Sequence, residues 1–181
     1  SALSLQCDHR PFASEAGDAA RVRARTVVIA TGAQYRKPPL EALVRFEGVG
    51  VYYAATFMEA QLCTGEEVIV IGGANSAAQA AVFLAERARK VHILVRGEGL
   101  AATMSRYLVH RIENHPTIEL HPCTELVAVE GETHPTSVRW RDTRSLKEES
   151  RPIRHVFVMT GASPAARWMA GCLALDADRF I

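Results

Sequence analysis

The chain lacks the features that define several classes of protein. Its 21 Lys and Arg stand against 20 Asp and Glu, so the net charge of +1 over 181 residues offers no basic excess for nucleic acid or an anionic membrane. No apolar run approaches the roughly 20 residues that span a bilayer. The first ten residues carry Gln6, Asp8 and His9 instead of a signal peptide's apolar segment. We therefore expect no nucleic-acid partner, no membrane partner and a cytoplasmic location.

The four cysteines and seven histidines lack paired spacing. The four cysteines at 7, 63, 123 and 172 are far apart, whereas disulfide scaffolds and structural zinc sites use denser or paired cysteines. The sequence therefore predicts four unlinked thiols in a reducing compartment. His110 and His115 lack the i, i+4 spacing of a helical metal pair, and a proline interrupts His121-Pro122-Cys123. No metal ion is expected.

What is present is an alternation of short apolar runs and helix-forming segments, within a composition that is 48% hydrophobic and 23% charged. That composition excludes disorder, and the alternation is typical of an α/β fold. Buried strands are predicted at Arg25–Thr31, Glu67–Ile71, Val91–Val95 and Ile153–Met159. Helices are predicted at Ala54–Cys63, Ala77–Ala88 and Met104–Glu113.

Other segments are predicted to be irregular or antiparallel. Tyr35–Gly50 contains two prolines and two glycines and is interpreted as a linker. Lys147-Glu148-Glu149 is interpreted as a solvated turn. A short helix is predicted through Trp168. Three short extended runs predict an antiparallel meander inserted into the α/β frame, namely Ile118–Pro122, Glu125–Glu130 and Ser137–Arg141.

A glycine turn directly follows the predicted strand Glu67–Ile71 and opens a helix. Strand, glycine turn and helix together begin a dinucleotide-binding βαβ unit, although Ala74 stands where the fingerprint has its second glycine. The free N–H groups and positive dipole end of such a helix stabilise a pyrophosphate. The alternative is that the glycines only form a tight turn. The predicted binding residues are Gly72, Gly73, Ala74, Asn75 and Ser76.

Arg96 follows the next predicted strand, at the position that selects between the two nicotinamide coenzymes. A carboxylate there accepts hydrogen bonds from the ribose 2′-hydroxyl of NAD, whereas an arginine favours the 2′-phosphate of NADP. The guanidinium can hold that phosphate through two charge-assisted hydrogen bonds. The sequence therefore predicts NADPH as the coenzyme. Arg106, at the start of a predicted helix, is a second candidate phosphate partner, and a solvated surface arginine is the alternative at both positions.

Three motifs in order resemble the low-molecular-weight thioredoxin reductases, within the FAD/NADPH-dependent pyridine nucleotide-disulphide oxidoreductases. Val27–Gly32 is similar to the family's second FAD-domain motif, Ile71–Ala77 to its NADPH loop, and Phe157–Pro164 to the segment that returns to the FAD domain. The resemblance implies that Thr31 and Gly32 contact FAD in an intact relative. In this chain their local role is to end a strand.

The resemblance also implies a domain organisation. A Rossmann-type NADPH-binding domain with an antiparallel β-meander crossover is expected at 41–161. Residues 1–40 and 162–181 are then remnants of an FAD domain. The family's N-terminal FAD fingerprint and its later Gly-Asp motif have no counterpart here, so the chain is expected to be the middle part of a longer protein.

Two further departures from the family concern chemistry. The redox pair Cys-Ala-Thr-Cys is matched by Ala54-Ala55-Thr56-Phe57, so both sulfurs are missing, and Cys63 nearby is interpreted as an ordinary helix thiol. Dithiol exchange needs a thiolate and a resolving partner, which this segment does not supply. The family's His-Arg-Arg is matched by Val95-Arg96-Gly97, so only one of the two arginines is kept.

The resemblance implies an enzyme that, as a full-length protein, transfers hydride from NADPH to FAD. The electron acceptor is unknown and is not reached through a local CxxC motif. No side chain is assigned a catalytic role, because the flavin carries the chemistry, and the fragment alone is expected to be inactive. The resemblance is also compatible with a homodimer. Two alternatives are a non-catalytic nucleotide-binding regulatory module and a disulfide reductase that uses cysteines outside this fragment.

Overall fold

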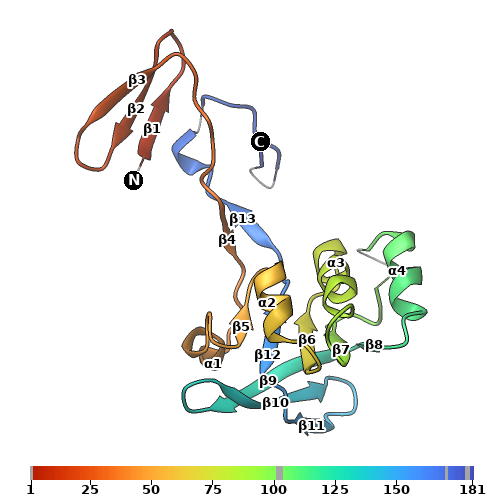
Figure 1. Ribbon diagram of the computed structural model, residues 1–181. Coiled ribbons are helices and arrows are strands. Elements are labelled where there is room, and N and C mark those ends of the chain that lie inside the picture. Colours follow the sequence, from red (N-terminus) through yellow and green to blue (C-terminus); the bar gives the residue numbers. More distant parts are fainter. Residues whose placement is uncertain (1, 101–103, 170, 178–179) are drawn as a thin grey trace. The chain divides into compact units, whose positions relative to one another are not determined.

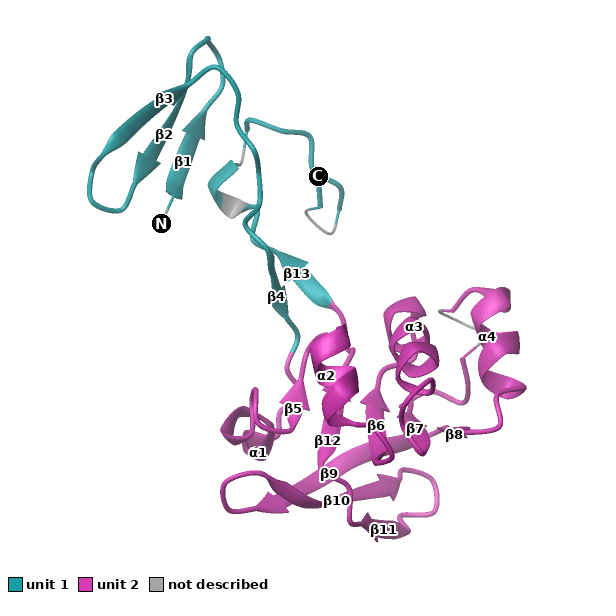
Figure 2. Ribbon diagram, viewed as in Figure 1, with its two compact units in different colours: residues 1–36, 162–181 teal, residues 37–161 magenta. Residues whose placement is uncertain are grey.

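The chain forms two compact units, each built from its own sheets (Figures 1 and 2). The computed structural model describes residues 2–100, 104–169, 171–177 and 180–181. Unit 1 comprises residues 1–36 and 162–181, and unit 2 comprises residues 37–161. Unit 1 is therefore assembled from the two ends of the chain, and unit 2 from the continuous segment between them.

A five-stranded parallel sheet forms the centre of unit 2. Its order is β5 (Val51–Tyr52), β12 (His155–Val158), β6 (Glu67–Ile71), β7 (Lys90–Leu94) and β8 (Ile118–His121). In the central strands, Ile69 pairs with Val156 on one side and His92 on the other. Parallel strands are usually covered on both faces, which explains the apolar runs that made these strands recognisable.

Helices cover one face of this sheet, with α2 (Phe57–Leu62), α3 (Asn75–Leu84) and α4 (Arg106–Glu113) lying on the same side (Figure 1). Alternate residues of a strand point to opposite faces. Val68 and Val70 accordingly pack under the helices, where the small side chains of α3 allow close approach. The alanines buried there are Ala77, Ala78 and Ala81.

A three-stranded antiparallel sheet and the short helix α1 (Glu41–Arg45) contribute to the core on the opposite face. The sheet order is β11 (Glu148–Arg151), β10 (Pro135–Asp142) and β9 (Thr124–Gly131). Ile69 and Ile71 point to this side and form a second buried cluster with Val138 and Trp140. The parallel sheet is therefore the middle layer of three, which keeps its strands away from water.

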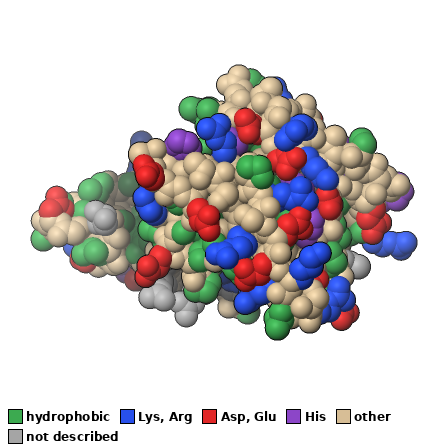
Figure 3. Space-filling view, turned by 90° about the horizontal axis from the view of Figure 1, so that it is seen from below, with side chains coloured by type: hydrophobic (Ala, Val, Ile, Leu, Met, Phe, Trp, Pro, Cys, Tyr) green, Lys and Arg blue, Asp and Glu red, His purple; other side chains and the backbone are tan. Residues whose placement is uncertain are grey.

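Charged side chains of both signs alternate on the face that Figure 3 shows. Several form cross-strand pairs on the antiparallel sheet. Arg141 Nη2 lies 2.6 Å from Glu125 Oε1, and Arg139 Nη1 lies 3.3 Å from Glu148 Oε2. Among the described side chains in this view, no continuous patch of one sign forms. No described helix has the length and apolar character needed to cross a membrane.

Unit 1 consists of two small sheets and a short turn of helix. A three-stranded antiparallel sheet contains β1 (Ala2–Gln6), β2 (Phe12–Ala16) and β3 (Arg21–Ala24), while β4 (Ala33–Tyr35) pairs with β13 (Ala162–Pro164). A 3₁₀ helix, η1 (Arg167–Met169), follows β13 and confirms the short helix predicted through Trp168. Most side chains of these strands are exposed or half-buried.

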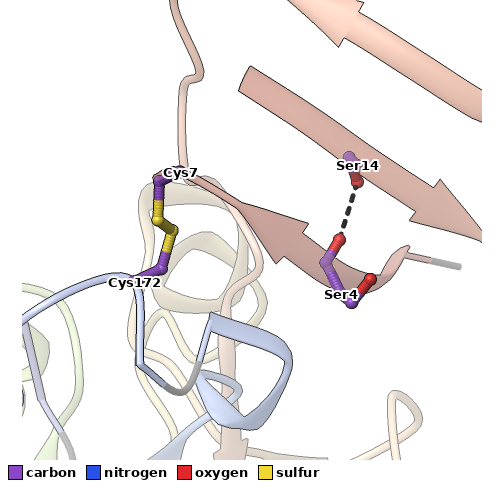
Figure 4. The surroundings of a disulfide bond; sticks show 4 residues. All are labelled: Ser4, Cys7, Ser14 and Cys172. Carbon is purple, nitrogen blue, oxygen red and sulfur yellow. Dashed lines mark hydrogen bonds between the residues drawn. A yellow bond between two sulfur atoms is a disulfide. The ribbon is translucent and has the colours of Figure 1, made fainter. Parts of the chain in front are cut away.

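The prediction of four unlinked thiols was wrong for two of the cysteines. Cys7 and Cys172 form a disulfide in unit 1, close to the bond in which Ser14 Oγ donates to the Ser4 carbonyl at 3.2 Å (Figure 4). The two cysteines are far apart in sequence, and their partnership arises because unit 1 is built from both ends of the chain. Cys63 and Cys123 are free and buried. The cytoplasmic location stays a prediction.

Two predictions for the N-terminal third were wrong. Residues 25–31 form no strand, and Val28 is 88% exposed. A β-branched run forms a ladder only when another strand lies beside it, and no described residue pairs with this segment. The supposed linker 35–50 contains α1, whose Leu43 is buried, followed by the buried Phe46. The helix has only five residues, and the prolines and glycines on either side of it favoured the interpretation as a linker.

The antiparallel meander is confirmed, but with different members. Residues 118–121 belong to the parallel sheet as β8, paired with β7. The third strand of the meander is instead β11, which includes Glu148 and Glu149 of the supposed turn. Charged residues are tolerated there because the edge strand of an antiparallel sheet exposes one face to water. The strand predicted at 67–71 is confirmed with the same bounds, and the three predicted helices are confirmed in shorter form.

Phe157 lies in the buried sheet and is 0% exposed, so Phe157→Ala should lower the free energy of unfolding by about 3–5 kcal/mol. Phe57→Ala is the matched control, because this ring is 56% exposed and rests mainly beneath Arg87. Phe57→Ala should lower the free energy of unfolding by about 1 kcal/mol or less. Urea unfolding measures both values. Equal losses in the two variants would contradict the assigned core.

Candidate functional site

The turn between β6 and α3 lies at the carboxyl end of the parallel sheet, where ligands bind in open α/β folds. Gly72 has a φ of +144°, and a Cβ there would lie only 2.4 Å from the carbonyl oxygen of Met159. Its N–H donates to the Leu94 carbonyl at 3.1 Å. The turn is therefore held between the ends of β12 and β7, in a backbone conformation that only glycine tolerates.

The N-terminus of α3 is open to a ligand. Ala74 is the N-cap residue and has no side chain that could accept a hydrogen bond from the first turn. Ala74, Asn75 and Ser76 are exposed. The first N–H groups of a helix lack partners within the helix, and the dipole makes this end positive. An anion can therefore take the place of a side-chain cap.

Asn75 connects the turn to the start of α4. Its Oδ1 accepts a hydrogen bond from the Ser105 backbone N–H at 2.8 Å. Ser105 is the N-cap residue of α4, so this bond places Arg106, the first residue of that helix, beside the glycine turn. The sequence predicted both residues for the site but not the contact that joins their helices. This bond makes Asn75 a positioning residue.

Arg96 is the second residue after β7 and is exposed. Its loop is fixed from both sides, because Cys123 N–H donates to the Gly97 carbonyl at 2.8 Å and Thr124 N–H donates to the Val95 carbonyl at 2.9 Å. Neither Arg96 nor Arg106 forms an ion pair with an acidic residue in the described part of the chain. Both guanidinium groups are thus available to an anionic ligand.

Thr31 and Gly32 belong to unit 1 and are exposed. They precede β4 directly, and Gly32 has a φ of +67° with open space around its Cα. The strand that they were predicted to end does not form. The geometry of the turn after β6 is built without them.

The segment that matches the family's redox motif is a helix start. Thr56 is the N-cap residue of α2, where its hydroxyl accepts from Met58 N–H at 3.3 Å and Glu59 Oε2 accepts from Thr56 N–H at 2.9 Å. This is a capping box, which fixes the entry to a helix. Phe57 lies beneath the guanidinium of Arg87, with 5.1 Å between the guanidinium carbon and the ring centroid. The segment therefore has a structural role and offers no sulfur.

Cys63 does not replace the missing pair. Burial, reinforced by the charges of Glu66 and Glu59, raises the pKa of its thiol to about 12. The Sγ donates to the Glu59 carbonyl at 3.1 Å. Since the thiolate is the reactive form, this thiol is inert at neutral pH. The interpretation of Cys63 as an ordinary helix thiol agrees with these contacts.

A second polar cluster, which the sequence analysis missed, is made by His92, Glu119 and His121. These residues lie on β7 and β8, and the register pairs His92 with Glu119. Alternation along a strand places Glu119 and His121 on one face. The only sequence signal was this i, i+2 spacing on a segment that we had assigned to the meander.

The fold and the turn define an α/β protein with a parallel sheet and a glycine turn at its carboxyl edge. The family model of the pyridine nucleotide-disulphide oxidoreductases matches residues 15–181. The chain therefore belongs to this family.

Its relatives are named as thioredoxin reductases. The chain is 34% identical over 176 residues to thioredoxin reductase of Escherichia coli O157:H7, covering 95% of this chain and 54% of the relative. It is 30% identical over 164 residues to the Mycolicibacterium smegmatis enzyme, covering 88% and 50%. The chain thus spans about half the length of these relatives. The solved thioredoxin reductase of Giardia duodenalis has a TM-score of 0.84 at 24% identity, over 98% of this chain and 58% of that structure, which shows the shared fold.

Gly72→Val should abolish binding of NADPH and NADH alike, because a side chain would collide with the Met159 carbonyl and open the turn. Gly99→Val is the control, since that position has no positive φ and has open space for a side chain. Calorimetry measures binding, and circular dichroism shows whether each variant is folded. Undiminished binding by folded Gly72→Val would argue against this turn as the site.

The thiol count follows from the disulfide and from the burial of the other two cysteines. Native protein should show almost no thiol that reacts with a disulfide reagent at pH 8. Denaturation without reductant should release two thiols, and denaturation with prior reduction should release four. Four reactive thiols without reductant would mean that Cys7 and Cys172 are not joined.

Proposed function

We propose that this chain carries the NADPH-binding part of a thioredoxin reductase-like flavoprotein oxidoreductase. Residues 41–161 form the NADPH-binding domain, and residues 1–40 and 162–181 are segments of the FAD domain. The observation that carries this proposal is the glycine turn after β6, which presents an uncapped helix N-terminus beside two exposed arginines without acidic partners among the described residues.

The coenzyme is held by backbone and by charge. The first-turn amides and the dipole of α3 bind the pyrophosphate, which can approach closely because Ala74 presents only a methyl group. Arg96 binds the 2′-phosphate of the adenosine ribose through charge-assisted hydrogen bonds, each worth about 1.5–3 kcal/mol. Arg106 adds positive charge at the start of α4, where the Asn75–Ser105 bond holds it. These groups bind and orient NADPH, and no side chain of the chain acts as acid or base.

The flavin is assigned to the full-length protein. Bound FAD accepts a hydride and so supplies the redox chemistry of such enzymes. The described residues of unit 1 include no α-helix, and so they offer no helix N-terminus for the FAD pyrophosphate. Thr31 and Gly32 alone do not make a flavin site. The fragment by itself is therefore inactive in this proposal, and its part in the reaction is to deliver NADPH in a fixed orientation.

The acceptor of the electrons is not reached through a local dithiol. The capping box at Thr56 and Glu59 occupies the place of the family's redox pair, and Cys63 is buried and protonated. Without a thiolate and a resolving thiol, dithiol exchange cannot proceed from this segment. The identity of the acceptor and the formation of a homodimer stay predictions.

Arg96→Ala should weaken NADPH binding at least tenfold while leaving NADH binding nearly unchanged. The loss of one charge-assisted bond of about 1.5 kcal/mol accounts for that factor. Arg154→Ala is the matched control, because Arg154 is also exposed but precedes β12, at the amino ends of the strands. Calorimetric titration of both variants with NADPH and with NADH gives four affinities, which are compared with those of the parent. Equal weakening of NADPH binding and NADH binding by Arg96→Ala would contradict the assignment of Arg96 to the 2′-phosphate.

A further inference from the structure

The side of the parallel sheet that faces the antiparallel sheet carries a polar cluster in an otherwise apolar layer. Glu67 on β6, His92 on β7, and Glu119 and His121 on β8 all point to this side, because they alternate with residues buried under the helices. His92 is 1% exposed, His121 is 16% exposed and Glu119 is 46% exposed. Two imidazoles and a carboxylate thus meet at the edge of the core.

The three ligand-type groups lie at mutual distances that suit one small cation. His92 Nδ1 is 3.0 Å from His121 Nε2 and 3.9 Å from Glu119 Oε2, and His121 Nε2 is 3.7 Å from Glu119 Oε1. Zinc binds nitrogen and oxygen at about 2.0–2.2 Å, so tetrahedral ligands of one ion lie about 3.4 Å apart. The observed spacings lie on both sides of that value, the two distances to Glu119 being to different carboxylate oxygens. One ligand atom from each of the three residues lies within 4.8 Å of the other two.

We propose that His92, Glu119 and His121 bind a divalent transition-metal ion of the zinc type, at a site separate from the nucleotide site. Two imidazoles and one carboxylate are a ligand set that zinc uses with one position left for water. The ligands come from two adjacent strands, so the bound ion would clamp the edge strand β8 to β7.

The surroundings of the imidazoles resemble the support that metal-bound histidines receive. His92 Nε2 lies 3.4 Å from Glu67 Oε2, so the N–H of His92 can face this carboxylate while Nδ1 faces the ion. A carboxylate behind a ligating imidazole fixes its tautomer and orientation. The ring of Trp140 packs against both imidazoles, with centroids 5.4 Å from His92 and 5.3 Å from His121. Both rings are therefore held in place before any ion binds.

A neighbouring cavity agrees with metal binding. His121 lines a cavity of about 250 Å³ together with Trp140 and Asp142, which is large enough for water. Water from this cavity can complete the coordination.

Lys90 is the competitor for the carboxylate. Its ammonium forms an ion pair with Glu119 Oε2, in which the two side chains are 41% and 46% exposed. Pairs of this kind contribute about 1 kcal/mol or less. A divalent ion held also by two imidazoles can therefore displace Lys90, and the ion pair accounts for the position of Glu119 when no metal is bound.

Calorimetric titration of the untagged, metal-stripped protein with ZnCl₂ tests the site. We expect saturable binding with a stoichiometry of about one. His121→Ala should abolish this binding, and Glu119→Gln should weaken it more than tenfold. Glu67→Gln, which alters the support behind His92 and also the ion pair with Arg89, should weaken it about 10–100-fold. His110→Ala is the control, because this histidine is exposed on α4 and should leave zinc affinity unchanged.

NADPH affinity separates this proposal from the nucleotide site. Because Glu119 is on the face opposite the helices, Glu119→Gln should bind NADPH as the parent does, and circular dichroism should show it to be folded. Since Glu119 is half-exposed, this variant decides the matter even where His121→Ala fails to fold. The absence of saturable zinc binding, or equal affinities in Glu119→Gln and His110→Ala, would overturn the proposal.

Discussion

The burial of β6 between β12 and β7 is the constraint on which the rest of the structure depends. Each strand is covered on both faces, by helices on one side and by the antiparallel sheet on the other. The ends of these strands also fix the Gly72 turn, through the Leu94 carbonyl and the close approach of Met159. Because a buried parallel sheet cannot shift without exposing apolar side chains, the helix that follows starts in one defined place.

The two faces of the same sheet carry different chemistry. On the helix side, the N-termini of α3 and α4 are joined by the Asn75–Ser105 bond and present positive dipole ends beside Arg96 and Arg106. On the other side, His92 and His121 lie against Trp140, close to the carboxylate of Glu119. The nucleotide site is formed by turns at the carboxyl ends of the strands, whereas His92 and His121 lie on the face where Trp140 packs.

Much of the frame could be predicted from local pattern. The strand at 67–71, the following glycine turn and the helices at both sides of it were recognisable because burial and helix geometry leave strong periodic signals. The sequence predictions were wrong where the structure of a segment depends on which strand lies beside it. Residues 25–31 have the composition of a strand but no described neighbour to pair with, and residues 118–121 form a parallel strand although their pattern suggested an antiparallel meander. Periodicity identifies a strand but not the strand beside it.

The amino-acid order alone therefore specified the family, the α/β class, the turn at Gly72 and the loss of the redox thiols, since each of these is written in contiguous residues. Only the folded chain decided that Cys7 meets Cys172, that Asn75 holds α4, and that His92 meets Glu119 and His121. These contacts join residues far apart in sequence or on different strands. Their formation depends on sheet order and register, which the packing of the whole domain determines.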